Sequence, residues 1–154
     1  MTVSGSGAFR FSWKMFHNSP NILLIDDNKH GLIARQAGLR ERGYRVEIAC
    51  GGKAGLSKFD EGDFDLVVTD YRMPDVSGAQ VLQGVRERRP GIPVVILSGF
   101  AAKLALTRQQ TGADAVLMKG PSELDDLLRA VGRLLKKRPA SAGRSGTSAA
   151  AAGA

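Results

Sequence analysis

The stretch that decides the fold is DLVVTDYRMPDVSG, residues 65–78. It opens with a short apolar run that ends in Asp70, a pattern typical of a buried β-strand. The run is continuous rather than alternating, as expected of a strand in a parallel sheet whose two faces are both covered. Asp70 would then lie at the carboxyl end of its strand.

The same strand pattern recurs on both sides of this stretch and alternates with helical patterns. We predict strands over residues 21–26, 44–50, 65–70, 93–98 and 115–119, and helices over residues 28–42, 52–59, 79–89, 101–111 and 121–137. In the first helix, Leu32, Ile33 and Leu39 are expected to face the core. Pro121 is expected at the first position of the last helix. This alternation predicts an α/β fold, with a doubly wound five-stranded parallel sheet in a three-layer α/β/α domain.

The composition fits one domain with an extension at each end. The chain has 154 residues, and its hydrophobic content of 43% is enough for a core. We expect an N-terminal extension over 1–20, a folded domain over 21–137 and a disordered Ala/Ser/Gly-rich tail over 138–154. The single cysteine, Cys50, excludes an internal disulfide and gives no zinc site. No apolar run could cross a bilayer and no secretion signal is present, so we expect a cytoplasmic protein without membrane contact.

The formal charge of +7 is concentrated at the two ends of the chain. Residues 1–20 carry +2 and residues 136–154 carry +4, with no acidic residue in either segment. The body between them is close to neutral. We therefore interpret the basic ends as solubilising segments and expect no direct DNA binding.

Polar residues stand at the ends of four predicted strands. They are Asp26 and Asp27 after the first strand, Asp70 after the third, Ser98 after the fourth and Lys119 after the fifth. In doubly wound sheets, ligands bind outside the carboxyl ends of the strands. Three crowded carboxylates need a counter-charge, and oxygen ligands without His or Cys favour Mg²⁺. Together with the Lys119 ammonium, such a site suits a phosphoryl group whose acceptor is a carboxylate.

Four motifs, LLIDDN, DLVVTDYRMPDVSG, VVILSG and VLMKG, resemble the receiver domain of two-component response regulators. The resemblance covers about residues 20–137, and the acidic pair, the D-x-x-M-P-x-x-x-G motif, the strand-end Ser and the strand-end Lys occur in the family's order. It implies a flavodoxin-like (βα)5 fold. Because only the low-complexity tail follows the last predicted helix, we expect a stand-alone receiver similar to the chemotaxis regulators.

The resemblance also implies a role for each residue of the constellation. Asp70 corresponds to the phosphoacceptor, Asp27 to a direct Mg²⁺ ligand, and Asp26 to an acid that acts through a metal-bound water. The backbone carbonyl of Arg72 corresponds to the third protein ligand of the metal. Ser98 and Lys119 correspond to the hydroxyl and the ammonium that contact the phosphoryl group.

The implied function is phosphoryl acceptance from a sensor histidine kinase or a histidine phosphotransfer protein, in a Mg²⁺-dependent reaction. The signal would pass to a downstream partner protein that the sequence does not identify. We expect no enzymatic activity beyond self-phosphorylation and slow self-dephosphorylation, and a monomer or weak dimer.

Two positions depart from the family pattern. Gly120 stands where proline usually follows the lysine, so we expect a trans bond after Lys119 and a different loop. Val116 stands where many receivers have a Tyr or Phe that moves on activation, and valine has no ring to move. Two alternatives stay open: an interaction module that works without phosphorylation, and a Mg²⁺-dependent phosphohydrolase. The second is disfavoured because such enzymes commonly place an acid where Arg72 stands.

Overall fold

The structure is a computed structural model that describes residues 19–99 and 107–137. Its strands are β1 (Asn21–Asp26), β2 (Arg45–Cys50), β3 (Leu66–Asp70), β4 (Val94–Ser98) and β5 (Ala115–Met118). Its helices are α2 (Lys29–Glu41), α3 (Gly52–Glu61), α4 (Gly78–Arg88), α5 (Arg108–Thr111) and α6 (Glu123–Lys136). The predicted extension and tail lie almost wholly outside the described residues, as does most of the helix predicted over 101–111.

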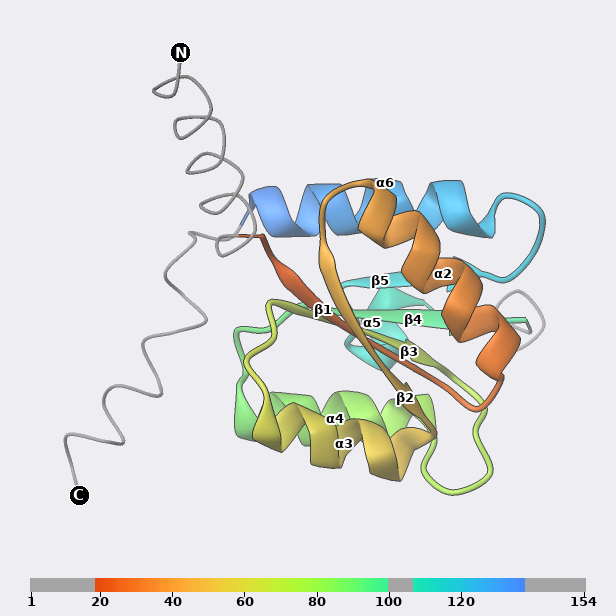
Figure 1. The fold of residues 1–154 in the computed structure, drawn as a ribbon. Coiled ribbons are helices and arrows are strands. Elements are labelled where there is room, and N and C mark those ends of the chain that lie inside the picture. The colour runs from red at the N-terminus through yellow and green to blue at the C-terminus, as the bar shows by residue number, and fades with distance from the viewer. Residues whose placement is uncertain (1–18, 100–106, 138–154) are drawn as a thin grey trace, which may run out of the picture.

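The five strands form one parallel sheet in the order β2-β1-β3-β4-β5. Helices α2 and α6 cover one face of this sheet and α3 and α4 cover the other (Figure 1). This is the predicted flavodoxin-like α/β fold. The chain runs from β1 outward to β2 and then returns to β3 on the other side of β1. The carboxyl ends of β1 and β3 therefore meet where the winding reverses, which is where such sheets bind ligands.

Alternate strand residues feed two separate apolar cores. In β1, Ile22 and Leu24 pack on the α2/α6 side, whereas Leu23 and Ile25 pack on the α3/α4 side. The strands β3 and β4 divide their side chains in the same way. This explains why their sequences are apolar throughout, since both faces are buried. Two packed faces hold the strand ends, and the polar residues on them, in fixed positions.

The first helix corrects one predicted core position. Leu32 and Leu39 are buried as expected, but Ile33 is 57% exposed. The buried position on the same stripe is Arg35, which is 8% exposed. Residues 32, 35 and 39 follow the spacing of one helix face, and residue 33 points about 100° away from residue 32.

The start of the last helix is also corrected. Pro121 is not the first helical residue, because α6 begins at Glu123 after an N-cap at Ser122. The Glu123 amide donates to the Gly120 carbonyl at 3.1 Å, and Ser122 has φ −93° and ψ 3°. These values are those of the third residue of a type I turn, whose second position favours proline. Pro121 therefore makes the turn that precedes α6.

Candidate functional site

Three carboxylates meet at the carboxyl ends of the central strands. Asp26 ends β1, Asp27 follows it, and Asp70 ends the neighbouring strand β3. One carboxylate oxygen of each lies within 4.8 Å of those of the other two. Asp26 and Asp70 are buried and Asp27 is exposed, so the cluster opens to solvent on the Asp27 side. The sequence prediction that these three acids lie together is confirmed.

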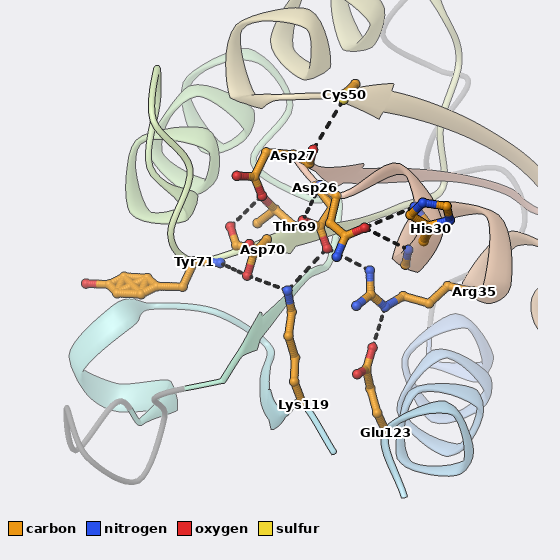
Figure 2. A network of polar contacts seen from close by, with 12 residues as sticks. Asp26, Asp27, His30, Arg35, Cys50, Thr69, Asp70, Tyr71, Lys119 and Glu123 are labelled. Carbon is orange, nitrogen blue, oxygen red and sulfur yellow. Dashed lines mark hydrogen bonds and ion pairs between the residues drawn. The ribbon is translucent and has the colours of Figure 1, made fainter. Parts of the chain in front are cut away.

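Lys119 directs its ammonium into this cluster (Figure 2). Its Nζ lies 3.1 Å from Oδ1 of Asp70 and 3.2 Å from Oδ2 of Asp26. The Lys119 amide donates to the Ser98 carbonyl at 3.0 Å, which continues the β4–β5 ladder by one residue. The expected trans bond after Lys119 is confirmed, since the described residues contain no cis peptide bond.

Ser98 lies at the same edge of the sheet as the acids. It is 2% exposed and ends β4, one residue beyond the β4 residue that pairs with Asp70 in the parallel ladder. Its position at the strand end is therefore as predicted, between the strands that carry Asp70 and Lys119.

The sequence interpretation missed Arg35 and Glu123. Nη1 of Arg35 donates to Oδ2 of Asp26 at 2.8 Å, and its Nε donates to Oε1 of Glu123 in the first turn of α6. Figure 2 shows the guanidinium between these two carboxylates. The available signal was a charged residue on the apolar stripe of the first helix, between Leu32 and Leu39. A charge at such a position is buried only when it is paired.

Burial and neighbouring charges perturb the acids in different directions. Burial opposes ionisation of Asp26, but hydrogen bonds from the Asn28 amide and Arg35 outweigh it and hold its pKa below the ordinary value. Burial and the charge of Asp26 raise the pKa of Asp70, against the opposing effect of Lys119. Contact with Asp26 raises the pKa of Asp27. The raised pKa values of Asp70 and Asp27 indicate that the site has too little positive charge to balance its carboxylates.

The loop after β3 is held close to Asp70. The Tyr71 amide donates to Oδ1 of Asp70 at 2.9 Å, and the Gly78 amide donates to the Tyr71 carbonyl at 2.7 Å. A Cβ on Gly78 would lie 2.4 Å from the Asp70 carbonyl oxygen, so only glycine allows this close approach. The loop also contributes Arg72, which lines the same open pocket as Asp27.

The donor set fits a magnesium ion. It consists of carboxylate oxygens with no His or Cys among them, and one of the three acids is open to solvent. Mg²⁺ prefers oxygen ligands and retains several of its waters, which an open pocket permits. Asp26, Asp27 and Asp70 are the carboxylates that could hold it.

Known proteins resemble this chain in both sequence and structure. A family model described as the response regulator receiver domain matches residues 22–132. The transcriptional regulatory protein ZraR of Escherichia coli is 35% identical over 114 residues, which are 73% of this chain and 26% of ZraR. The transcriptional regulatory protein PrrA of Mycobacterium tuberculosis is 32% identical over 125 residues, 80% of this chain and 53% of PrrA. The chain thus spans about half or less of these relatives.

Solved structures agree with the sequence relatives. A CheY-like receiver domain protein of Methanospirillum hungatei has a TM-score of 0.70 and 32% identity, covering 77% of this chain and 95% of that one. The response regulator TrrA of Thermotoga maritima, in complex with Mg²⁺-BeF, has a TM-score of 0.67 and 28% identity, covering 75% of this chain and 98% of that one. Among the described residues, no helix is long and apolar enough to span a membrane.

Proposed function

Because the chain belongs to the response regulator receiver domain family, we propose that it accepts a phosphoryl group on Asp70 in a Mg²⁺-dependent reaction. The observation that carries this proposal is the grouping of three carboxylate side chains with the Lys119 ammonium at the β1/β3 strand ends. The donor would be a sensor histidine kinase or a histidine phosphotransfer protein.

In this reaction a carboxylate oxygen of Asp70 attacks the phosphorus of a phosphohistidine. A P–O bond forms as the P–N bond breaks, and the imidazole leaves with its electron pair and takes a proton from solvent. The product is a mixed anhydride, whose phosphoryl oxygens need nearby positive charge. Lys119 already lies 3.1 Å from Asp70 and is in position to supply it.

Mg²⁺ would neutralise the phosphoryl oxygens together with Lys119. We assign Asp27, Asp70 and the Arg72 carbonyl as its direct protein ligands. Asp26 would act through a metal-bound water, because its Oδ2 receives Arg35 and Lys119 and its Oδ1 receives the Asn28 amide. A relative in the same family, TrrA, was crystallised with Mg²⁺-BeF, which supports a metal at this site.

Phosphorylation adds about −1.5 to −2 charges to the pocket. We propose that Ser98 and Lys119 follow this charge and favour one of two existing conformations. Val116 is partly buried against the α3/α4 core and has no ring that could move inward. The signal would therefore leave the domain without an aromatic switch at this position, and would pass to a partner protein rather than directly to DNA.

The test uses the full chain, MgCl₂ and acetyl phosphate as a small phosphodonor, with intact-protein mass and inorganic phosphate release as readouts. We expect a phosphoprotein that requires Mg²⁺ and is absent in Asp70→Asn. The matched control is Asp63→Asn, which removes an exposed carboxylate that precedes β3, at the opposite end of that strand from Asp70, and should leave labelling unchanged.

Two other results would refute this proposal, and each would indicate a different function. An unlabelled wild-type protein that keeps its fold would indicate an interaction module that works without phosphorylation. Continuous multiple-turnover release of phosphate from phosphate esters would indicate a phosphohydrolase.

A further inference from the structure

A buried cation already sits beside the acidic cluster. Among the residues that the structure describes, Arg35 is the one basic side chain in the buried class, at 8% exposure. A charge out of contact with water is strongly disfavoured unless it is paired and hydrogen-bonded. Arg35 has two partners, and they belong to different parts of the molecule.

One partner is part of the candidate metal site and the other is not. Asp26 lies in the acidic cluster at the end of β1, whereas Glu123 lies in the first turn of α6. Lys119 contacts the same Oδ2 of Asp26, at 3.2 Å. The side chains thus form a row of alternating charge, Lys119–Asp26–Arg35–Glu123, which runs from the acidic cluster to α6 (Figure 2).

Two glycines of α2 leave space for this row of side chains. Gly31 lies one turn before Arg35, and a Cβ at Gly31 would lie 3.0 Å from Nη1 of the guanidinium. A Cβ at Gly38 would lie 2.6 Å from Leu124 Cδ1, next to Glu123 on α6. The absence of side chains at these two positions makes room for the guanidinium and for the close approach of α6.

We propose that Arg35 competes with a divalent cation for the charge of Asp26, and that Glu123 sets the strength of this competition. When Glu123 shares the guanidinium, less of its positive charge acts on the acidic cluster. Cation binding and the Arg35–Glu123 pair are then linked, and the linkage is reciprocal. Occupation of the acidic cluster would strengthen the Arg35–Glu123 contact, so the first turn of α6 would sense the cation. Arg35 is a positioning residue here and not a catalytic one. This inference rests on the proposed Mg²⁺ site.

The competition predicts that substitutions of Arg35 and of Glu123 change the Mg²⁺ affinity in opposite directions. Arg35→Met removes the competing charge and keeps an apolar stem for packing, so Mg²⁺ should bind on the order of tenfold more tightly. Glu123→Gln leaves the whole guanidinium charge on Asp26, so Mg²⁺ should bind about threefold more weakly. A purely structural role for Arg35 would instead make both variants bind more weakly, because Asp26 would lose its orientation.

The experiment is a MgCl₂ titration of the full chain at constant ionic strength, followed by backbone amide chemical shifts. Arg40→Met and Asp125→Asn are the matched controls, since each removes a charge from the same helix as the test residue and neither side chain contacts Asp26. We expect α6 first-turn amides to shift with Mg²⁺ in the wild type and to lose that shift in Arg35→Met. If Arg35→Met unfolds, Arg35→Gln takes its place, because it removes the charge but keeps a side-chain N–H that can donate to Asp26, and Mg²⁺ should again bind more tightly.

The inference is overturned if the two variants shift the affinity in the same direction, or if neither differs from its control. Its failure is distinct from failure of the proposed function. A wild-type protein that does not bind Mg²⁺ at the acidic cluster would refute the metal site itself, whereas normal wild-type binding with unchanged variants would refute only the competition.

Discussion

Removal of the Asp70 charge should stabilise the protein when no metal is present. The site and its immediate neighbours hold four carboxylates and only two cations: Asp26, Asp27, Asp70 and Glu123 against Arg35 and Lys119. Asp70→Asn keeps the size of the side chain and an oxygen for the Tyr71 amide, but removes one negative charge. We expect a gain in the free energy of unfolding on the order of 1 kcal/mol near neutral pH. For a domain of this size, that gain raises Tm by roughly 3–6 °C.

The direction of the pKa shift gives this effect a pH dependence. Burial and the charge of Asp26 raise the pKa of Asp70 in the folded protein. Asp70 therefore contributes stability below its unfolded pKa of about 4, and this contribution is lost as the pH rises through the higher folded pKa. The difference between Asp70→Asn and the wild type should be small near pH 4 and should grow toward neutral pH.

In Mg²⁺, the wild type should become more stable to unfolding than Asp70→Asn. A ligand at ten times its Kd stabilises the folded state by about 1.4 kcal/mol. The wild type should gain this amount, whereas Asp70→Asn lacks one of the carboxylates proposed to bind the metal and should gain much less. If Mg²⁺ narrows or reverses this difference in stability, the acids form a metal site and do not merely repel one another.

The assay is urea unfolding followed by far-UV circular dichroism, in EDTA and in MgCl₂, over this pH range. Asp63→Asn controls for the loss of a negative charge elsewhere. Two results would refute the reasoning: lower stability of Asp70→Asn than of the wild type in EDTA at neutral pH, or an equal gain from Mg²⁺ in both proteins.

Three further substitutions test contacts at the site and elsewhere in the domain. Lys119→Met leaves two buried carboxylates without their ammonium and should lower the unfolding free energy in EDTA by about 1–3 kcal/mol, measured by urea unfolding. Gly78→Ala places a Cβ 2.4 Å from a backbone oxygen that cannot move aside, so we expect a loss of about 2–4 kcal/mol and reduced phosphorylation by acetyl phosphate. Arg86→Met removes hydrogen bonds to the carbonyls of Ile92 and Gly112 and should lower Tm by several degrees, about 1–2 kcal/mol, without changing Mg²⁺ affinity. An unchanged Tm would show that Arg86 acts as a solvated side chain.

The strands and the acidic cluster were predictable because their signals are local. Each central strand is a continuous apolar run, and Asp26, Asp70 and Ser98 end three of them. In a parallel sheet, consecutive strands point the same way, so residues at strand ends must share an edge. The sequence order of these residues was therefore enough to bring them together.

The arginines were not predictable because their partners are distant in the sequence. Arg86 and Arg89 stand at the C-terminal end of α4, and each has partners elsewhere in the chain. Arg86 donates to two carbonyls and to Asp114, whereas Arg89 donates to the Phe59 carbonyl and lies 4.6 Å from the centre of its ring. A basic residue near a helix C-terminus fits its local environment whether or not it has such partners. Local sequence therefore could not distinguish the two cases.

Gly120 shows how one departure from the family pattern has two different effects. Lys119 still points toward the acidic cluster. The β4–β5 ladder fixes its direction, since it continues as far as the hydrogen bond from the Lys119 amide to the Ser98 carbonyl. The extra residue is taken up afterwards, in the turn that ends at Glu123. Neighbouring residues of a helix point about 100° apart, so the length of this turn decides which α6 side chain faces Arg35. Gly120 therefore leaves Lys119 in contact with the acidic cluster, and the turn that it opens leads directly to Glu123, the α6 residue that contacts Arg35.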